Sequence, residues 1–434
     1  MTQNAELHKR HQAAITNGVG TKSIYAAKAE NAELWDVEGK RYIDFAAGIA
    51  VNNTGHRHPK VMAAVADQAA RFTHTCFHVA PYESYIALAE RLNEIAPIDG
   101  PAKTMLVTTG AEAVENAIKI ARISTGRSAV ISFSGGFHGR TMMAMGLTGK
   151  VVPYKKGFGP FPADVYHAPF PYEYAGVTSN DALSGLQHLL NADVDPNRVA
   201  AFVIEPVQGE GGFVPAPDEF LSELRRLADD HGILLIVDEV QAGMARTGKM
   251  FGIEHANIKA DIVTMAKGLA GGFPLSAVVG KADLMDATHP GGLGGTYAGN
   301  PMAIAAAHAV LDVIDEEKLC DRATHIGEKI NNRLKDIAAR QGMEAIGDIR
   351  GPGAMLAFEL VTDPQTKTPD AALAASIVAE AEKRGLILLV CGTRFNVVRL
   401  LPPLTIPDDI LNEALDILEA AIEAAISKTS QSAA

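Results

Sequence analysis

The sequence has little cysteine and no long apolar run, and each absence excludes a class of protein. Its 3 cysteines, Cys76, Cys320 and Cys391, lie far apart and are odd in number, so a disulfide framework has no support. No uninterrupted apolar run approaches the roughly 20 residues that a membrane helix needs. The start, MTQNAELHKRHQ, lacks the apolar core of a signal peptide. We therefore expect a cytoplasmic protein in a reducing compartment, with no membrane partner.

Basic residues are also in short supply. Lysine and arginine number 39 against 51 aspartates and glutamates, which gives a net charge of -12 at pH 7. Nucleic acids require a basic face, so we expect no nucleic-acid partner. The nucleotide-binding loops G-x-x-x-x-G-K-[ST] and G-x-G-x-x-G are absent as well. Small anions are not excluded, because a local pocket can bind them.

The 434 residues are enough for one large domain and a smaller one, and 47% of them are hydrophobic. In the middle of the chain, short β-branched runs alternate with amphipathic helical stretches, a pattern typical of a mostly parallel sheet covered by helices. A helix is predicted at 217–232, with acidic residues early and Gly232 as its end. Strands are predicted at 104–109, 128–133, 199–205, 232–239 and 260–267.

The pattern changes near residue 310. A charged helix is predicted over 323–341, followed by paired strand-like runs, LILLV and NVVRLL. The N-terminal stretch 32–48 predicts a hairpin with VEGK as its turn. We therefore predict an α/β protein in three parts: 1–60, a segment that contributes to the small domain; 61–309, the large domain; and 310–434, a small α+β domain.

Polar residues end several of the predicted strands. In an open parallel sheet, ligands bind beyond the carboxyl ends of the strands, so Glu205, Asp238 and Lys267 are expected at one edge. The unit TMLVTTGAEAVENA adds a strand, a turn at Gly110 and the start of a helix, whose free N–H groups would face an anion such as phosphate.

These features together suit pyridoxal phosphate. That cofactor needs an amine for its aldehyde, an acid for its ring nitrogen and an anion site for its phosphate. Lys267 would provide the amine, made nucleophilic by partial desolvation that lowers its pKa. Asp238 would keep the ring nitrogen protonated. A lysine after an apolar strand is more often a surface residue, but its combination with Asp238 and Gly110 favours the cofactor.

The chain resembles the class III pyridoxal-phosphate aminotransferases of fold type I. The resemblance rests on an ordered set of stretches that extends from about residue 17 to 420 and covers nearly the whole chain. They are FAAGIAVNNTGHRHP, TTGAEAVENAIKIAR, FSGGFHGRT, IEPVQGEGGF, LLIVDEVQAG, AKGLAGGFPL, GGTYAGNP and NVVRLLPPLTI.

The resemblance implies roles for the cofactor-binding residues. Gly110 and Ala111 would bind the phosphate through backbone N–H groups, although many relatives carry a serine at the position of Ala111. Phe137 and Val240 would pack on the two faces of the cofactor ring. Three further residues are implied: Gln241 near the ring hydroxyl, Glu205 at the cofactor, and Thr296, which would reach the phosphate in the neighbouring subunit of a homodimer.

The resemblance also implies a substrate site. Arg140 would bind the carboxylate of 4-aminobutyrate or the distal carboxylate of 2-oxoglutarate, and Arg399 the α-carboxylate of glutamate or 2-oxoglutarate. Guanidinium suits both because it pairs with carboxylate bidentately. Since 4-aminobutyrate lacks an α-carboxylate, Glu210 would pair with Arg399 in that half-reaction and move away in the other. Ile49 would line the substrate pocket.

The expected activity is transamination of 4-aminobutyrate with 2-oxoglutarate, giving succinic semialdehyde and glutamate through pyridoxamine phosphate. The alternative is another ω-aminotransferase, acting on 5-aminovalerate, ornithine, acetylornithine or putrescine. An aminomutase or decarboxylase is less well matched, and so is a non-catalytic protein of this fold, because both Lys267 and Asp238 are present. The expected assembly is a homodimer or a dimer of dimers.

A metal site is not expected. HTCFH places His74, Cys76 and His78 at alternating positions, which would put three ligands on one face of a strand. No fourth ligand of suitable spacing follows.

Overall fold

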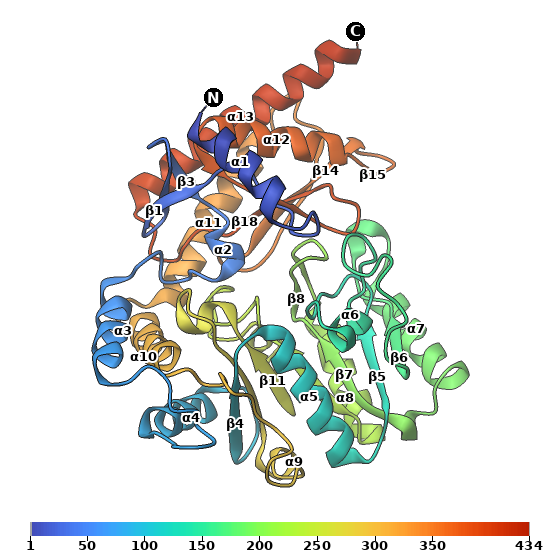
Figure 1. Cartoon of the computed structure of the whole chain (residues 1–434). Coiled ribbons are helices and arrows are strands. Elements are labelled where there is room, and N and C mark those ends of the chain that lie inside the picture. The colour runs from blue at the N-terminus through green and yellow to red at the C-terminus, as the bar shows by residue number, and fades with distance from the viewer. Residues whose placement is uncertain (1, 434) are drawn as a thin grey trace.

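A seven-stranded sheet forms the centre of the computed structural model, which describes residues 2–433 (Figure 1). Its strand order is β4-β12-β11-β10-β7-β5-β6. Strand β12 is antiparallel to both of its neighbours, whereas the pairs from β11 to β6 are parallel. The strands are β4 (Ala102–Val107), β5 (Ala129–Phe133), β6 (Val165–Ala168), β7 (Val199–Ile204), β10 (Leu234–Asp238), β11 (Ile262–Met265) and β12 (Ser276–Lys281).

Each of the five strands predicted for the large domain is present: β4 has the predicted length but begins two residues earlier, and the other four are shorter than predicted by one to four residues. Two further strands, β6 and β12, were not predicted. Strand β12 follows a glycine-rich turn after Lys267 and inserts between β4 and β11. The sheet is therefore mostly parallel, as expected, with one antiparallel strand inside it.

Both faces of the sheet are buried, which explains the continuous apolar runs of its strands. Side chains alternate along a strand, so Phe202 and Val237 enter one core cluster while Val203 and Ile236 enter the other. Helix α5 (Gly110–Thr125) packs on β12, β11 and β7 over the second cluster. On the opposite face lie α7 (Ser179–Ala192) and α8 (Asp218–His231), as Figure 1 shows.

Helix α8 confirms the prediction made from its end signals. Asp218 and Glu219 lie in its first turn, where the helix dipole favours negative charge. Gly232 ends it in the left-handed region with φ 59°, a conformation that glycine adopts without steric cost.

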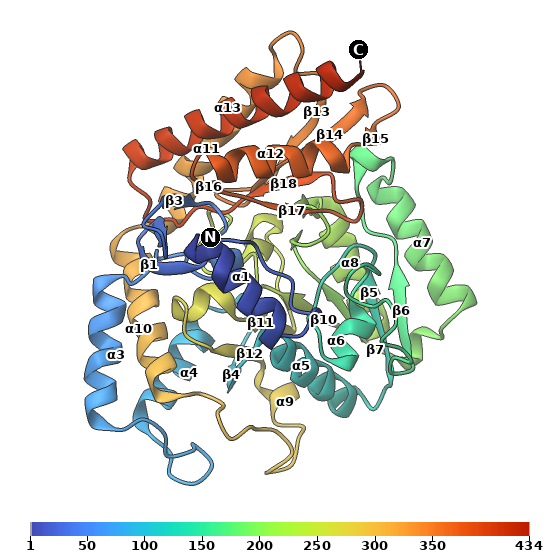
Figure 2. The ribbon, with the colours of Figure 1, turned by 45° about the horizontal axis from the view of Figure 1, so that its top comes forward.

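The C-terminal part of the chain forms a second layer above the large sheet (Figure 2). Its sheet has the order β13-β14-β18-β17, with β15 paired to β14, and the predicted pairing of LILLV with NVVRLL is the antiparallel β17–β18 pair. The elements are α11 (Leu319–Ala338), β13 (Ile346–Arg350), β14 (Leu356–Asp363), β15 (Thr368–Pro369), α12 (Ala371–Lys383), β16 (Leu386–Ile387), β17 (Leu389–Cys391), β18 (Val397–Leu400) and α13 (Asp408–Ala433).

The N-terminal hairpin joins this layer. Strand β2 (Glu33–Asp36) pairs with β3 (Arg41–Asp44) in antiparallel register around the predicted turn. Strand β1 (Ala26–Glu30) extends the sheet on one side, and β16 pairs with β3 in parallel on the other. This pairing supports our proposal that residues 1–60 contribute to the small domain.

The predicted domain boundary at residue 309 falls inside helix α10 (Pro301–Glu316). That helix packs along α3 (Pro59–Arg71) and also contacts α4 (Glu83–Ile95), both of which belong to the predicted large domain. We therefore place the boundary at Lys318, where the chain turns with φ 51° before α11.

The remaining elements are α1 (Gln3–Ala14), α2 (Ala47–Ala50), α6 (Met142–Leu147), α9 (Ala282–Met285), the short strands β8 (Val207–Gln208) and β9 (Val214–Pro215), and four short 3-10 helices (Glu173–Ala175, Pro196–Arg198, Gly252–Ala256, Lys267–Ala270).

One arginine ties the three predicted parts together. Arg246 is fully buried, and it donates to the backbone carbonyls of Ala354 and Pro402 in the small domain and to the side chain of Asn53 in the N-terminal segment. Burial lowers its pKa to about 9, since no carboxylate among the described residues forms an ion pair with it.

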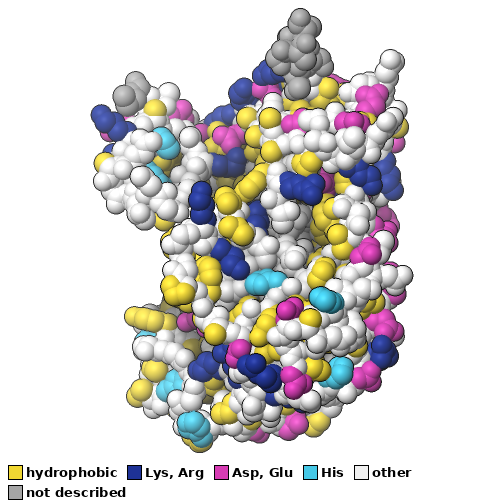
Figure 3. All heavy atoms as spheres, turned by 90° about the vertical axis from the view of Figure 1, so that its right-hand side faces the viewer, with side chains coloured by type: hydrophobic (Ala, Val, Ile, Leu, Met, Phe, Trp, Pro, Cys, Tyr) yellow, Lys and Arg dark blue, Asp and Glu magenta, His cyan; other side chains and the backbone are white. Residues whose placement is uncertain are grey.

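Within residues 2–433, no helix has the length and apolar character needed to span a membrane. Figure 3 shows basic and acidic side chains mixed over one face of the molecule, without a large area of one sign.

The end of α5 allows a test of backbone strain. Gly126 ends the helix with φ 69°, and a Cβ built there would meet no atom within 4 Å. Gly126→Ala should therefore destabilise the protein by about 1 kcal/mol through backbone strain alone. The measurement is the midpoint of urea unfolding. Gly18→Ala, at an equally open position without a positive φ, should leave the midpoint unchanged, and an equal loss in both variants would contradict the explanation.

Candidate active site

The carboxyl ends of the central strands meet at a cavity of about 500 Å3. It lies where the sequence placed it, because parallel strands bring their carboxyl ends to one edge of the sheet. Most of the predicted site residues line it: Gly110, Ala111, Phe137, Arg140, Glu205, Asp238, Val240, Gln241 and Lys267.

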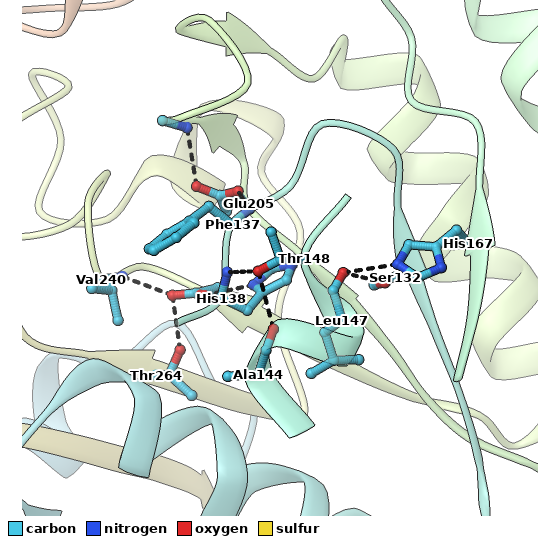
Figure 4. Close-up of polar contacts among 12 residues, drawn as sticks. Ser132, Phe137, His138, Ala144, Leu147, Thr148, His167, Glu205, Val240 and Thr264 are labelled. Carbon is cyan, nitrogen blue, oxygen red and sulfur yellow. Dashed lines mark hydrogen bonds and ion pairs between the residues drawn. The ribbon is translucent and has the colours of Figure 1, made fainter. Parts of the chain in front are cut away.

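Asp238, the last residue of β10, is held by three hydrogen bonds (Figure 4). Its Oδ1 accepts from the Val240 N–H and the Thr264 hydroxyl, both at 3.1 Å, and its Oδ2 lies 2.8 Å from Nδ1 of His138. Burial disfavours a charged His138, yet the hydrogen bond and charge of Asp238 raise the pKa of that histidine. The carboxylate is therefore fixed in position beside the cavity.

The start of helix α5 presents free N–H groups to the same cavity. Thr109 and Glu112 form a capping box, in which the Thr109 hydroxyl accepts from the Glu112 N–H and the Glu112 carboxylate accepts from the Thr109 N–H. Within the described part of the chain, no residue accepts from the N–H of Gly110 or Ala111. A Cβ on Gly110 would lie 3.1 Å from Val240, so the glycine allows the start of α5 to lie close to the segment after β10 that carries Val240.

Lys267 lies two residues after the end of β11 and begins a short 3-10 turn with φ 43°. Burial lowers its pKa to about 8, and the negative charge of Glu210 partly opposes this effect. The amine is therefore neutral far more often at neutral pH than an ordinary lysine, whose pKa is about 10.4. A neutral amine is the form that attacks a carbonyl carbon.

Glu205, at the end of β7, organises the two loops beside the cavity. Its Oε2 accepts from the Phe137 N–H at 2.8 Å and its Oε1 from the Gly209 N–H at 3.0 Å. Burial raises its pKa to about 7. Glu205 thus holds the segment that carries Phe137 against the loop that leads to Glu210.

The residues present fit pyridoxal phosphate, and Gln241 provides an independent indication. Its Oε1 is buried and has no hydrogen-bond partner within residues 2–433. A buried amide oxygen normally accepts a hydrogen bond, so it points to a ligand that can donate one, as the ring hydroxyl of this cofactor can. Phe137 and Val240 supply apolar surface for a flat ring, and Asp238 supplies the acid.

Glu210 and Arg399 form a buried ion pair beside this cavity. Burial alone would raise the pKa of Glu210, but Arg399 and a 2.7 Å hydrogen bond from the Tyr154 hydroxyl lower it to about 2. The pair also joins the two domains, because Arg399 lies on β18 and Glu210 lies on the loop between β8 and β9.

Tyr154 connects this pair to two further cations. The Arg140 guanidinium lies 4.7 Å from the centre of the Tyr154 ring, and the Phe137 ring centre lies 4.7 Å from it on the cavity side. The Nζ of Lys150 lies 5.7 Å from the same ring and 4.4 Å from the Phe395 ring. Lys150 is only 4% exposed, and burial lowers its pKa.

Two predicted residues lie apart from the cavity of this single chain. Ile49 is 42% exposed and has φ 68°, an unusual conformation for a β-branched residue, while Val51 lines the cavity close by. Thr296 is exposed on the loop that precedes α10. Its predicted role belongs to a dimer, so it stays a prediction.

The sequence reasoning missed three residues that hold site side chains in position, His138, Tyr154 and Thr264, and a buried neighbour of Tyr154, Lys150. His138 lies inside the FHGRT stretch, and its polar side chain beside a predicted strand end was a usable signal. Lys150 and Tyr154 belong to GKVVPY, an ordinary loop pattern by sequence. The three residues His74, Cys76 and His78 do not share a strand face, because the chain turns at Cys76 with φ 58°.

Known proteins match the chain over nearly its full length. The family model for class-III aminotransferases matches residues 14–422. The 5-aminovalerate aminotransferase DavT of Pseudomonas aeruginosa is 53% identical over 96% of this chain and 97% of its own length. The 4-aminobutyrate aminotransferase GabT of Escherichia coli is 51% identical over 96% of this chain and 98% of its own.

Solved structures agree with this assignment. An aminotransferase of Bacillus anthracis superposes with a TM-score of 0.90 at 30% identity, covering 98% of this chain and 100% of that one. An ornithine aminotransferase of Toxoplasma gondii gives a TM-score of 0.86 at 30% identity, covering 98% and 96%. The chain belongs to the class-III aminotransferases and is a pyridoxal-phosphate-dependent transaminase of fold type I.

Proposed function

We propose that this enzyme transfers the amino group of 4-aminobutyrate to 2-oxoglutarate, giving succinic semialdehyde and glutamate in two half-reactions. The observation that carries the proposal is the buried Glu210–Arg399 pair. It neutralises one arginine of the site, so a substrate with a single carboxylate is not met by an unpaired buried cation. Arg140, which forms no ion pair within the described residues, is left to bind that carboxylate.

The other residues have roles that suit this reaction. When bound, pyridoxal phosphate accepts the electrons left on the substrate carbon after deprotonation, and it stores the amino group between half-reactions. The Nζ of Lys267 takes the proton from that carbon, a task that suits an amine with a pKa of about 8. Asp238, fixed by His138 and Thr264, would hold the protonated ring nitrogen of the cofactor.

The second half-reaction brings two carboxylates. Arg399 would bind the α-carboxylate of 2-oxoglutarate or glutamate, and Arg140 the distal one, each through the planar fork of a guanidinium. Glu210 must then leave Arg399. Arg399 would thus pair with the α-carboxylate of a substrate that has one, and with Glu210 when the substrate has none.

A second candidate substrate is 5-aminovalerate, which is favoured by the 53% identity to a protein of that name. It differs from 4-aminobutyrate by one methylene, and such a difference commonly changes the selectivity of an apolar pocket by about 10- to 200-fold. Putrescine is less well supported, because it has no carboxylate to pair with Arg140. Ornithine and acetylornithine keep a carboxylate but carry a nitrogen substituent beside it, and they stay as further alternatives.

We also propose that the enzyme is a cytoplasmic homodimer in which Thr296 reaches the phosphate in the neighbouring site, with a dimer of dimers as the larger alternative. The exposed position of Thr296, next to Tyr297, which is 67% exposed, supports a contact with a second copy.

The first test follows the near-visible absorbance of the bound cofactor after 4-aminobutyrate is added without 2-oxoglutarate. The absorbance should fall and then return when 2-oxoglutarate is added. Lys267→Ala should lower the rate of the change by at least about a hundredfold, because the proton carrier is lost. A response to 5-aminovalerate at much lower concentration than to 4-aminobutyrate would transfer the proposal to the longer substrate, and an unchanged rate in Lys267→Ala would refute the role of Lys267.

The pKa of Lys267 predicts how cofactor uptake depends on pH. With a pKa of about 8, the neutral fraction of the amine rises from about a tenth at pH 7 to about half at pH 8. The rate at which cofactor-free enzyme binds pyridoxal phosphate covalently should therefore rise with pH and level off above 8. Glu210→Ser should move this midpoint lower, because the charge of Glu210 raises the pKa of Lys267. A midpoint above pH 10 would contradict the argument.

The Glu210–Arg399 pair predicts a difference between the half-reactions. Glu210→Ser leaves Arg399 charged and unpaired, so the reaction with 4-aminobutyrate should slow by about tenfold or more, whereas the reaction with glutamate should change less. The measurement is the single-turnover rate constant with each substrate. Equal losses with both substrates would count against a switch.

A further inference from the structure

Lys150 is a buried cation that has aromatic neighbours but no carboxylate partner among the described residues. Its side chain lies between the rings of Tyr154 and Phe395, and no carboxylate of residues 2–433 forms an ion pair with it. Among nearby charged groups, Glu210 attracts the ammonium most strongly, although it lies beyond ion-pair distance. Burying an unpaired ammonium is costly, so a position such as this is expected to have a use.

The backbone around Glu210 is fixed from several sides. The Glu210 carbonyl accepts from the Gly392 N–H at 3.0 Å, and the Gly212 carbonyl accepts from Nε of Arg350 at 2.9 Å. A Cβ on Gly211 would lie 2.6 Å from the carbonyl oxygen of Gly135, so the loop packs closely against the segment that contains Gly135. The Glu210 carboxylate can therefore leave Arg399 by rotation of its side chain, with the loop staying in place.

A rotated Glu210 needs a new counter-charge, because an unpaired buried carboxylate is unfavourable. If the proposed function holds, a dicarboxylate substrate occupies Arg399 and Arg140 at that moment, and Lys267 is engaged in proton transfer. Among the described cations near this loop, Arg350 already pairs with Asp348 and Glu359, so Lys150 is the one that has no carboxylate partner. Tyr154 lies along the path, since its hydroxyl already donates to Glu210 and its ring lies 5.7 Å from the Lys150 ammonium.

We propose that Lys150 is the alternative ion-pair partner of Glu210, a positioning residue that receives the carboxylate when the α-carboxylate of glutamate or 2-oxoglutarate takes Arg399. This inference rests on the proposed function and deepens it. With 4-aminobutyrate, Glu210 stays on Arg399 and Lys150 has no role in the reaction. With a dicarboxylate, the Glu210–Lys150 pair offsets part of the cost of breaking the Glu210–Arg399 pair.

The test compares Lys150→Met, which keeps the length of the side chain without its charge, with Lys150→Arg, which keeps the charge. Each variant reacts in single turnovers with glutamate and, separately, with 4-aminobutyrate. Lys150→Met should lower the second-order rate constant with glutamate by about ten- to a hundredfold, the range expected for a lost charged hydrogen bond. The reaction with 4-aminobutyrate should change by less than about threefold, and Lys150→Arg should restore most of the glutamate rate.

A double-mutant cycle with Glu210→Gln separates this role from a structural one. Without a carboxylate at position 210, loss of the Lys150 charge should have no further effect on the glutamate reaction, so the two substitutions should be non-additive. A full additional loss from Lys150→Met in the Glu210→Gln background would overturn the proposal. An equal or larger loss with 4-aminobutyrate would also overturn it, because Lys150 would then serve the substrate carboxylate or the fold.

The failure of the proposed function would look different. An unmodified enzyme that reacts with glutamate but not with 4-aminobutyrate would refute the assigned substrate, while the cycle on glutamate would still decide the role of Lys150.

Discussion

The parallel register of three strands determines where the chemistry of this enzyme lies. Strands β7, β10 and β11 are neighbours in the sheet and point the same way, so their last residues meet at one edge. Glu205, Asp238 and Lys267, which are far apart in the sequence, become walls of one cavity through this arrangement alone. Helix α5 then adds its N–H groups at the same edge. A reversal of one of these strands would carry its polar residue to the far side of the domain.

The site residues at the carboxyl ends of the parallel strands could be predicted from the sequence. The five predicted strands and the polar residues at their ends follow from apolar runs and their boundaries, which are local properties. Strand β12 was not predicted, because it follows a glycine-rich turn and its pairing with β4 and β11 depends on distant residues. The boundary predicted at residue 309 falls inside α10 for a similar reason. Its packing on α3 is a contact between residues more than 200 positions apart, which no local pattern records.

The residues that were missed act through contacts between loops. His138 matters because its ring meets Asp238 across 100 positions, and Tyr154 because its hydroxyl meets Glu210. Nothing in GKVVPY indicates that a lysine and a tyrosine there will be buried beside a pair of charges contributed by two domains. Ile49 and Thr296 present the opposite case. Their expected roles came from the resemblance to the family. Both residues are exposed in the single chain, and that exposure does not test roles that depend on a dimer or on a bound substrate.

The Glu210–Arg399 pair has one more consequence, because its two partners come from different domains. If the proposed roles hold, this ion pair would hold the small domain to the large one directly when 4-aminobutyrate is bound. With a dicarboxylate, the substrate itself would bridge the two domains, through Arg399 on one side and Arg140 on the other. Substrate charge and domain closure are then thermodynamically linked, so that each substrate would favour its own separation of the domains. One enzyme would thus have two closed forms, selected by the number of carboxylates that enter.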